Sequence, residues 1–312
     1  MKIALIVIAS VIVVFVIPHI IVLFHIFNRF FRCVDKETIN RKYMINPNYD
    51  QTREVTLEAM KYLETVSKEE VSITSFDGLK LTGDYFDSKS DTTIIMFHGA
   101  LADPYINFAH LIKMFLEEKY NVLVINQRGH YTSEGKYVTY GDKEKKDALS
   151  WIEFVGKDQN IKNIFLYGMS LGGTSLCLIS NQIVDPRVKG MFVDCAYTSV
   201  NELLDFLGKH NNAPTFLFMG GFKFLARHIA KVDFKETVTE EPLKESKIPT
   251  LFIHGTSDDV APIKFFNDNY NNCASEKDQF VVEGAMHTTA TIVKQKEAVM
   301  KIKSFIKEHI QI

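Results

Sequence analysis

The feature that most constrains the fold of this chain is a regular alternation of short apolar runs with longer stretches of helical spacing. Strands are expected at the apolar starts of six segments, which are residues 93–100, 121–129, 163–170, 188–197, 249–259 and 278–287. Helices are expected near residues 105–118, 142–156, 171–183, 262–271 and 289–309. Strands that are apolar on both faces and separated by helices are typical of a parallel sheet covered by helices. The sequence therefore predicts an α/β fold with a mostly parallel central sheet flanked by helices.

Two segments depart from this alternation. The stretch VSITSFDGLKLTGDYF, residues 71–86, contains two alternating runs that meet at Asp77-Gly78, which is a strong hairpin signal. Residues 199–247 are rich in phenylalanine and leucine and predict a helical cap insertion between two strands of the sheet. Two interpretations of its aromatic side chains stay open. They form the insertion's own core and its contact with the sheet, or they form an apolar lid over a pocket for acyl groups.

The N-terminus carries the longest apolar run of the chain. Residues Ile3–Phe27 are 25 residues without a formal charge, whereas a membrane span needs about 20. We therefore expect a transmembrane anchor over residues 1–28, a linker over residues 29–66 with a helix from about Thr52 to Val66, and one large domain over residues 67–312. A long signal peptide is the alternative, but no small-x-small cleavage site follows the run.

The charges around this run predict its orientation. Lys2 precedes it, whereas five basic residues follow it closely: Arg29, Arg32, Lys36, Arg41 and Lys42. Under the positive-inside rule the large domain then lies in the cytoplasm, attached to the cell membrane by a single span.

Charge and cysteine content exclude several classes of function. The formal net charge is −2, from 38 acidic and 36 basic residues, so no basic field for nucleic acid is expected. The four cysteines, Cys33, Cys177, Cys195 and Cys273, show no CxxC or CxxH spacing. We therefore expect buried free thiols, with no disulfide framework, no zinc site and no organic cofactor. The sequence does not predict an oligomeric state.

The stretch FLYGMSLGG contains the motif G-x-S-x-G at Gly168–Gly172. The motif alone is a modest signal, but here it follows an apolar strand and opens a helical segment, which is the context that a nucleophile elbow requires. A sharp turn at this place exposes the hydroxyl of Ser170 beyond the edge of the sheet. Ser170 is therefore the candidate nucleophile.

A serine hydroxyl needs a positioned base, which in turn needs an orienting acid. His287 follows the last predicted strand and is the candidate base. Asp258 follows the preceding strand and is the preferred acid, which gives the chain order Ser, Asp, His. Asp259 is an alternative that also suits a helix cap. Asp194, at the end of another strand near Ser170, is the rival acid.

Acyl transfer also needs hydrogen-bond donors for the oxyanion. The backbone N–H of Leu171, directly after the nucleophile, is one expected donor. The second is expected from the loop after residues 93–100, with Ala100 the best candidate and Leu101 the next. His98 in the same loop is expected to form structural hydrogen bonds rather than to act as a base.

These motifs together resemble the α/β-hydrolase superfamily over about residues 70–310. FHGALAD resembles the oxyanion-loop region of that superfamily. INQRGHYTSEG resembles the RGHGxSxG loop of prolyl-oligopeptidase-like and serine-aminopeptidase-like members, and FIHGTSDDVAP resembles the acid loop HGxxDxxVP. The closest likeness is to membrane-anchored bacterial hydrolases with one N-terminal span. The resemblance implies an α/β-hydrolase fold with a helical cap and an esterase-like activity, and it supplies no substrate.

The sequence departs from the family pattern at two places. Tyr131 stands where the second glycine of RGHG is usual, which predicts a bulkier loop and a narrower pocket mouth. Val260-Ala261 stands where the acid loop has valine directly before proline, which leaves open which aspartate is placed for catalysis.

The function that we expect is serine hydrolysis of a carboxylic ester or thioester through an acyl-enzyme, on a small-molecule or lipid-like substrate. A peptidase or amidase of the same fold is the alternative within enzymes. A non-catalytic binding protein on a hydrolase fold is the alternative outside them, although such a scaffold has no physical need for Ser170, Asp258 and His287 together.

Overall fold

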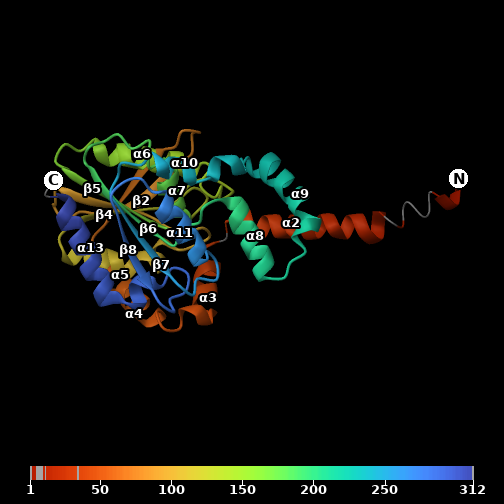
Figure 1. Ribbon diagram of the computed structural model, residues 1–312, viewed down its shortest axis with the longest axis horizontal. Coiled ribbons are helices and arrows are strands. Elements are labelled where there is room, and N and C mark those ends of the chain that lie inside the picture. The colour runs from red at the N-terminus through yellow and green to blue at the C-terminus, as the bar shows by residue number, and fades with distance from the viewer. Residues whose placement is uncertain (1, 5–9, 11, 34, 311–312) are drawn as a thin grey trace.

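The computed structural model describes residues 2–4, 10, 12–33 and 35–310, and its centre is one eight-stranded sheet (Figure 1). The strand order is β1-β2-β4-β3-β5-β6-β7-β8. The strands are β1 (Glu69–Thr74), β2 (Lys80–Phe86), β3 (Thr92–Phe97), β4 (Asn121–Ile125), β5 (Asn163–Met169), β6 (Val188–Asp194), β7 (Thr250–Gly255) and β8 (Lys277–Val282). Strands β3 to β8 pair in parallel, and β1 and β2 pair antiparallel. The predicted mostly parallel sheet is confirmed.

Helices cover both faces of the sheet, which explains why the strands are apolar on both sides. In β3, Ile94 and Met96 pack into the core beneath α4, α5 and α13, whereas Ile95 and Phe97 pack into the opposite core beneath α6 and α7. The flanking helices are α4 (Arg53–Leu63), α5 (Pro104–Glu117), α6 (Glu144–Gly156), α7 (Leu171–Ile179), α11 (Ile263–Asn272), α12 (Ala290–Val293) and α13 (Gln295–Ile310).

Most predicted elements are found within a few residues of their expected bounds. The hairpin is present as β1 and β2, and Gly78 in its turn has φ +86°, a conformation that favours glycine. Helix α7 ends at Ile179 rather than near residue 183, and the Ser180 hydroxyl after it lies at hydrogen-bond distance from the carbonyl oxygens of Cys177 and Pro242. The helix expected over residues 289–309 is interrupted at Lys294 and forms α12 and α13.

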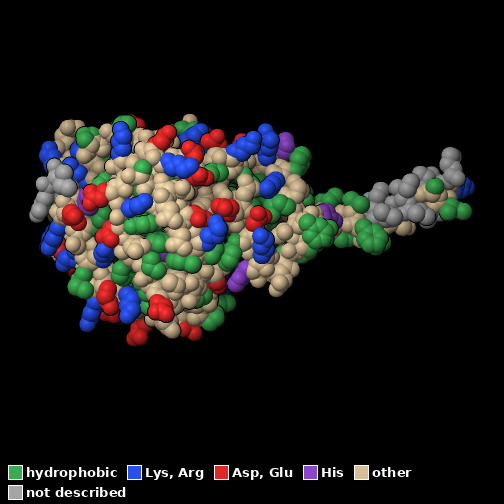
Figure 2. Space-filling model, in the orientation of Figure 1, with side chains coloured by type: hydrophobic (Ala, Val, Ile, Leu, Met, Phe, Trp, Pro, Cys, Tyr) green, Lys and Arg blue, Asp and Glu red, His purple; other side chains and the backbone are tan. Residues whose placement is uncertain are grey.

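The N-terminal segment contains one long apolar helix. A π-helical turn, η1 (Ile12–Val16), leads into α2 (Ile17–Phe31), and the helix over Val13–Phe31 is long and apolar enough to cross a membrane. The same description fits a signal sequence. Residues 1, 5–9 and 11 of the predicted anchor lie outside the described residues. Figure 2 shows α2 projecting from the globular part of the molecule, with hydrophobic side chains along it.

The linker after α2 is largely helical. It forms α3 (Lys36–Ile45), a 3₁₀ turn η2 (Pro47–Tyr49) and α4. Helix α4 corresponds to the predicted linker helix, and it packs against α5. Helix α3 is absent from the predictions, because it buries only Ile39 and Tyr43 and so leaves a weak apolar pattern.

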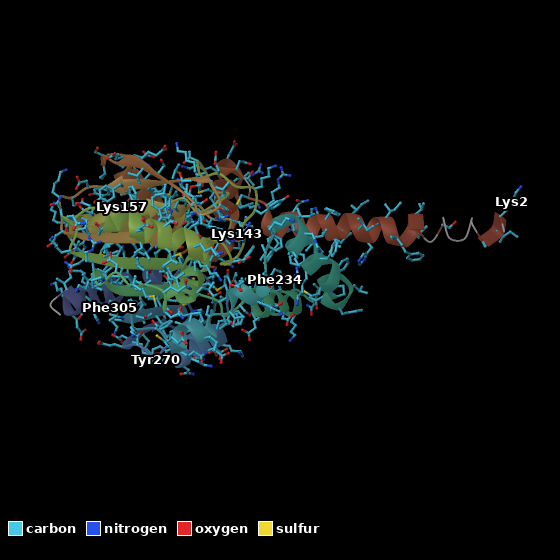
Figure 3. All side chains as sticks on the ribbon, turned by 90° about the horizontal axis from the view of Figure 1, so that it is seen from above. Lys2, Lys143, Lys157, Phe234, Tyr270 and Phe305 are labelled. Carbon is cyan, nitrogen blue, oxygen red and sulfur yellow. The ribbon has the colours of Figure 1, made fainter. Side chains whose placement is uncertain are left out.

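The insertion between β6 and β7 is helical, as expected. It forms α8 (Val200–His210), α9 (Thr215–Leu225), a π-helical turn η3 (Ala226–Ala230), a 3₁₀ turn η4 (Phe234–Thr237) and α10 (Glu240–Lys244). Two of its apolar side chains pack against α2, since Phe222 and Leu225 share one apolar cluster with Leu23, Phe27 and Phe31. Figure 3 shows α2 lying beside these helices where it leaves the domain.

Candidate active site

Ser170 lies in a tight turn between β5 and α7. Its φ is +52° and its ψ is −113°, which is a strained conformation for a residue with a side chain. The flanking glycines allow the turn to pack: a Cβ on Gly172 would lie 1.9 Å from the carbonyl oxygen of Phe97, and one on Gly168 would lie 2.5 Å from Gly172. The predicted strand–turn–helix is therefore present, and the spacing of the glycines follows from steric contact.

The structure brings together the three residues Ser170, His287 and Asp258. His287 Nε2 lies 3.0 Å from Ser170 Oγ, and His287 Nδ1 lies 2.7 Å from Asp258 Oδ2. His287 lies in the loop after β8, and Asp258 in the loop after β7. The other carboxylate oxygen of Asp258, Oδ1, accepts the N–H groups of Val260 at 2.9 Å and Ala261 at 2.8 Å. The acid is thus held by its own loop while it binds the imidazole.

The two alternative aspartates have other partners. Asp259 Oδ2 accepts a hydrogen bond from Asn48 Nδ2 at 3.1 Å. Asp194 is buried, and its Oδ2 accepts the Tyr167 hydroxyl at 2.9 Å. Of the three candidates, Asp258 is the one whose carboxylate bonds to His287.

Charge and burial shift the pKa values of these groups. Burial raises the pKa of Asp258, but the charge and hydrogen bond of His287, together with His254 and the Ala261 N–H, outweigh it, so the net pKa is below the ordinary value. Burial lowers the pKa of His287, but the charge and hydrogen bond of Asp258 outweigh it, and the net pKa is above the ordinary value. Burial raises the pKa of Asp194 to about 7. Asp258 is thus the carboxylate held in its charged form beside the imidazole.

The loop after β3 carries the candidate oxyanion donors. The Gly99 N–H donates to Asn107 Oδ1 at 2.9 Å, and the Leu101 N–H donates to His130 Nε2 at 3.0 Å. Among the described residues, the N–H groups of Ala100 and Leu171 have no hydrogen-bond partner. The N–H group of Leu101, the second choice after Ala100, therefore already has a hydrogen-bond acceptor, whereas the N–H groups of Ala100 and Leu171 are available to an oxyanion.

Two buried histidines support this loop. His98 accepts the Gln127 N–H at Nε2 (3.0 Å) and donates from Nδ1 to the Gly99 carbonyl (2.8 Å), which is the structural role expected for it. His130 accepts from Leu101 at Nε2 and donates from Nδ1 to the Arg128 carbonyl at 3.0 Å. The sequence pattern alone assigns His130 no role, although this residue lies in the RGHY stretch that resembles the RGHG loop.

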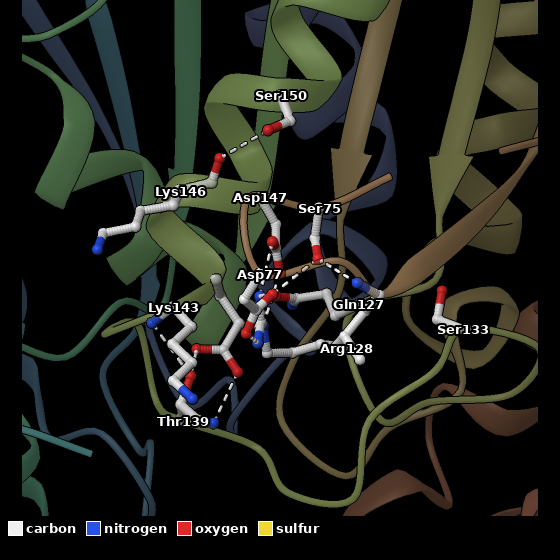
Figure 4. A network of polar contacts seen from close by, with 12 residues as sticks. Ser75, Asp77, Gln127, Arg128, Ser133, Thr139, Lys143, Lys146, Asp147 and Ser150 are labelled. Atoms are coloured by element: carbon white, nitrogen blue, oxygen red, sulfur yellow. Dashed lines mark hydrogen bonds and ion pairs between the residues drawn. The ribbon is translucent and has the colours of Figure 1, made fainter. Parts of the chain in front are cut away.

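An ion-pair network, buried at Arg128 and Asp147 and exposed at Asp77, holds the loop that carries His130 (Figure 4). The Arg128 guanidinium donates to both carboxylate oxygens of Asp147 at 2.7 and 2.8 Å and to those of Asp77 at 3.0 and 3.1 Å. The network joins the β1–β2 turn, the loop after β4 and helix α6. It fixes the backbone of Arg128, whose carbonyl in turn orients His130.

Tyr131 does not narrow the pocket mouth, and that expectation was wrong. It has φ +53°, the conformation in which glycine is usual, and it lines a separate hollow with Lys36, Lys68 and Tyr105. Tyr131 therefore keeps the backbone conformation usual for glycine, and its side chain lines that separate hollow.

A cavity of about 210 Å³ opens beside Ser170 and His287. One wall is the loop Gly99–Asp103. The opposite wall comes from the linker after α2, and its side chains are Ile39, Lys42, Tyr43, Asn46 and Tyr49. No described residue of the insertion 199–247 lines this cavity. The lid interpretation of the insertion is therefore wrong for this cavity, and α3 with η2 occupies that place. Sequence reasoning missed this wall because the linker's apolar pattern is weak.

The sulfur of Cys195 and the donor atoms of Asp258 and His287 lie within 4.8 Å of one another, a spacing at which a metal ion is conceivable. Both ring nitrogens of His287 already lie at hydrogen-bond distance from Asp258 and Ser170. The arrangement therefore suits proton transfer, and we assign no metal to it.

Comparisons with known proteins agree with this architecture. The family model described as serine aminopeptidase, S33, matches residues 88–217. The uncharacterized protein YqkD of Bacillus subtilis is 24% identical over 234 residues, which cover 74% of this chain and 76% of that protein. Protein bem46 of Schizosaccharomyces pombe is 23% identical over 62% of this chain and 60% of its own length.

Solved structures of the same architecture include esterases. The Pyrococcus furiosus esterase Pf2001 matches with a TM-score of 0.65 at 24% identity, over 80% of this chain and 95% of that one. The esterase EaEST of Exiguobacterium antarcticum matches with a TM-score of 0.57 at 17% identity, over 76% of this chain and 99% of that one. The chain has the α/β-hydrolase fold, and it is similar to hydrolases of the serine aminopeptidase group.

Proposed function

We propose that this protein of α/β-hydrolase fold is a serine hydrolase that cleaves a carboxylic ester or thioester through an acyl-enzyme. The observation that carries the proposal is the continuous hydrogen-bonded series from Asp258 through His287 to Ser170, with the serine on a strained strand-to-helix turn. A serine hydroxyl becomes nucleophilic when such a base removes its proton.

In the proposed mechanism His287 Nε2 takes the proton from Ser170 Oγ, which attacks the substrate carbonyl carbon. The N–H groups of Ala100 and Leu171 bind the oxyanion of the tetrahedral intermediate. His287 then gives its proton to the leaving alcohol or thiol, and the acyl-enzyme remains. Water attacks the acyl carbon and loses its proton to His287. Collapse of this second intermediate releases the acid, and His287 returns the proton to Ser170 Oγ. Asp258 keeps the proton of neutral His287 on Nδ1 and stabilises the imidazolium.

The shape of the cavity supports a small or acylated substrate. Ile39, Tyr43 and Ile106 contribute apolar surface to it, and Lys42 contributes a cation. The wall formed by α3 is separated from α2 by only a few residues. We propose that α2 anchors the protein in the cell membrane, with the large domain on the cytoplasmic side because of the basic residues after the span. A substrate at the membrane surface then reaches the cavity directly.

A peptidase or amidase activity is the second candidate, and the match to the serine aminopeptidase model over residues 88–217 favours it. The same groups perform both reactions, since the tetrahedral intermediate is common to esters and amides. Esters have the better leaving group, and the two solved structures named above are of esterases.

The test is a substrate panel on the purified full chain in detergent. The panel contains p-nitrophenyl esters of increasing acyl length, acyl thioesters and peptide amides. We expect ester or thioester turnover that Ser170→Ala abolishes. Ser175→Ala is the matched control, because the Ser175 hydroxyl bonds only to the Leu171 carbonyl within α7. Amide turnover exceeding ester turnover establishes the second candidate instead, and equal ester rates for wild type and Ser170→Ala refute both.

A further inference from the structure

Helix α9 of the insertion exposes a strongly apolar face to solvent. Phe216 is 83% exposed, Leu217 53% and Phe224 60%. Phe216, Gly220 and Phe224 follow one another at intervals of four residues, so they lie along one side of the helix. The opposite side is already occupied, since Phe222 and Leu225 are buried against α2. We call the residues Phe216, Leu217 and Phe224 the α9 apolar face.

Three contacts show how α9 lies against α2. The ring of Phe218 stacks on His19 with centroids 4.8 Å apart and planes 7° from parallel. Gly221 lies against Leu23, so closely that a Cβ on this glycine would be 2.5 Å from Leu23 Cδ2. Phe222 lies 5.3 Å from Phe31, ring to ring. Helix α9 therefore crosses α2, and its N-terminal end lies farther from the domain than its C-terminal end (Figures 1 and 3).

Because α9 packs against α2, the depth of α2 in a bilayer also determines the depth of α9. The uncharged run Ile3–Phe27 has 25 residues, about five more than the hydrocarbon core requires. Residues after about Val22 then lie in the interfacial region, and His19 lies about 5 Å deeper along the axis. Any bilayer that covers the exposed side chains of Ile20 and Ile21 therefore also reaches the end of α9 that stacks on His19.

The charges of this region suit the interface of a membrane. Residues 206–232 contain four basic residues, Lys209, Lys223, Arg227 and Lys231, and no acidic residue. All four are exposed. Figure 2 shows Lys and Arg side chains at the end of the domain from which α2 emerges. Long basic side chains beside an apolar helix face reach the lipid headgroups while their stems lie along apolar surface.

The loop that joins α8 to α9 also suits an interfacial position. Its backbone N–H groups at Asn211, Asn212 and Ala213 donate to the carbonyls of Leu207, Lys209 and Gly208. Backbone groups satisfied within the loop lower the cost of leaving water. The polar side chains of Asn211 and Asn212 limit the depth, so α9 is suited to lie at the interface and not to cross the bilayer.

We propose that α9 is a second membrane-embedded element, whose apolar face inserts into the same leaflet that α2 enters. The inference rests on the membrane anchoring by α2 proposed above. Two contacts with the bilayer, at α2 and at the α9 apolar face, then hold the domain in one orientation. The cavity wall of α3 is then kept at a fixed height above the headgroups.

The test uses the full chain in vesicles of phosphatidylcholine and phosphatidylglycerol. An environment-sensitive fluorophore is attached at Phe216→Cys, with Leu217→Cys as a second site. Ile21→Cys reports the span itself. Val184→Cys, in the exposed loop before β6 at the other end of the sheet, is the aqueous control. Protein with only the native cysteines gives the labelling background. Quenching by lipids spin-labelled at the top of the acyl chain is measured at each site.

We expect quenching at both α9 sites to be within about twofold of that at Ile21→Cys, because interfacial helices bury their apolar face near the acyl boundary. Val184→Cys is expected to show none. Quenching at Ile21→Cys with none at the α9 sites overturns the inference and leaves the anchor intact. Absence of quenching at Ile21→Cys refutes the anchor and with it the inference. Blue-shifted emission at the α9 sites that lipids do not quench, and that is lost on diluting protein in the vesicles, assigns the face to a second copy and also overturns it.

Discussion

The substitution Asp258→Asn is predicted to inactivate the protein because of the way the acid loop holds this side chain. Oδ1 of Asp258 accepts two backbone N–H groups, from Val260 and Ala261, at 2.9 and 2.8 Å. An asparagine amide must keep its carbonyl oxygen on these two donors, since an NH₂ group there would face them with no acceptor. The NH₂ group then faces His287 Nδ1 in place of Oδ2.

An NH₂ donor at this place reverses the tautomer of His287. Nδ1 accepts the amide hydrogen, so the ring proton moves to Nε2, which lies 3.0 Å from Ser170 Oγ. A protonated Nε2 cannot take the serine proton. The wrong tautomer in sites of this kind lowers kcat by about 10⁴-fold, which corresponds to about 5.5 kcal/mol in the activation free energy.

The same reasoning ranks three further variants. Asp258→Ala removes the orienting partner but imposes no tautomer, so Asp258→Asn, the closer isostere, is expected to be at least as damaging. Asp259→Asn and Asp194→Asn are expected to keep kcat within about tenfold of wild type, since neither carboxylate bonds to His287.

The assay is the initial rate of ester hydrolysis by each full-length variant, with circular dichroism to establish that each one is folded. A kcat for Asp258→Asn within tenfold of wild type refutes the tautomer argument. A loss for Asp194→Asn as large as that for Asp258→Asn assigns the acid to Asp194.

Three other predictions follow from the same contacts. The acid limb of the pH–rate profile is expected to have its midpoint above 6.5, the ordinary pKa of histidine. The reason is that Asp258 raises the pKa of His287, which acts as a base only when it is neutral. A midpoint below 6.5 contradicts this expectation. His130→Ala removes the acceptor of the Leu101 N–H and loosens the loop that carries the proposed Ala100 donor. The kcat should therefore fall by about 10- to 100-fold with little change in KM. A change confined to KM counts against a positioning role for His130. Arg128→Ala leaves Asp147 buried without its partner and should lower the free energy of unfolding by about 3–5 kcal/mol in urea titrations. The matched control is Lys157→Ala, which removes an exposed ion pair with Glu153 and should change the free energy of unfolding by less than about 1 kcal/mol.

The sheet and the meeting of Ser170, Asp258 and His287 follow from simple features of the sequence. Strands that are apolar on both faces and separated by helices indicate a parallel sheet, and the carboxyl ends of parallel strands lie at one edge of the sheet. Residues that follow β5, β7 and β8 are therefore brought near one another whatever their separation along the chain. The choice between Asp258 and Asp259 is of a different kind, because it depends on which carboxylate the N–H groups of Val260 and Ala261 hold.

The walls of the cavity are not predictable in this way. Helix α3 buries only two residues, and its position depends on contacts with segments far away in the chain, such as the hydrogen bond between Asn48 and Asp259. The insertion presents a related difficulty. Its phenylalanine content is typical of a lid, but Phe222 packs against α2, whereas Phe216 and Phe224 are exposed. Composition predicts that such side chains need an apolar partner, whereas tertiary structure decides which surface supplies it.

The central claim is that Ser170 is a nucleophile activated by His287, and covalent labelling by a fluorophosphonate measures this most directly. The adduct is located by intact-mass and peptide mass spectrometry of the folded full chain. We expect one adduct, on Ser170, that forms rapidly in wild type, is absent in Ser170→Ala and forms far more slowly in His287→Ala. Folded wild-type protein that remains unlabelled, or an adduct on another residue, contradicts the account.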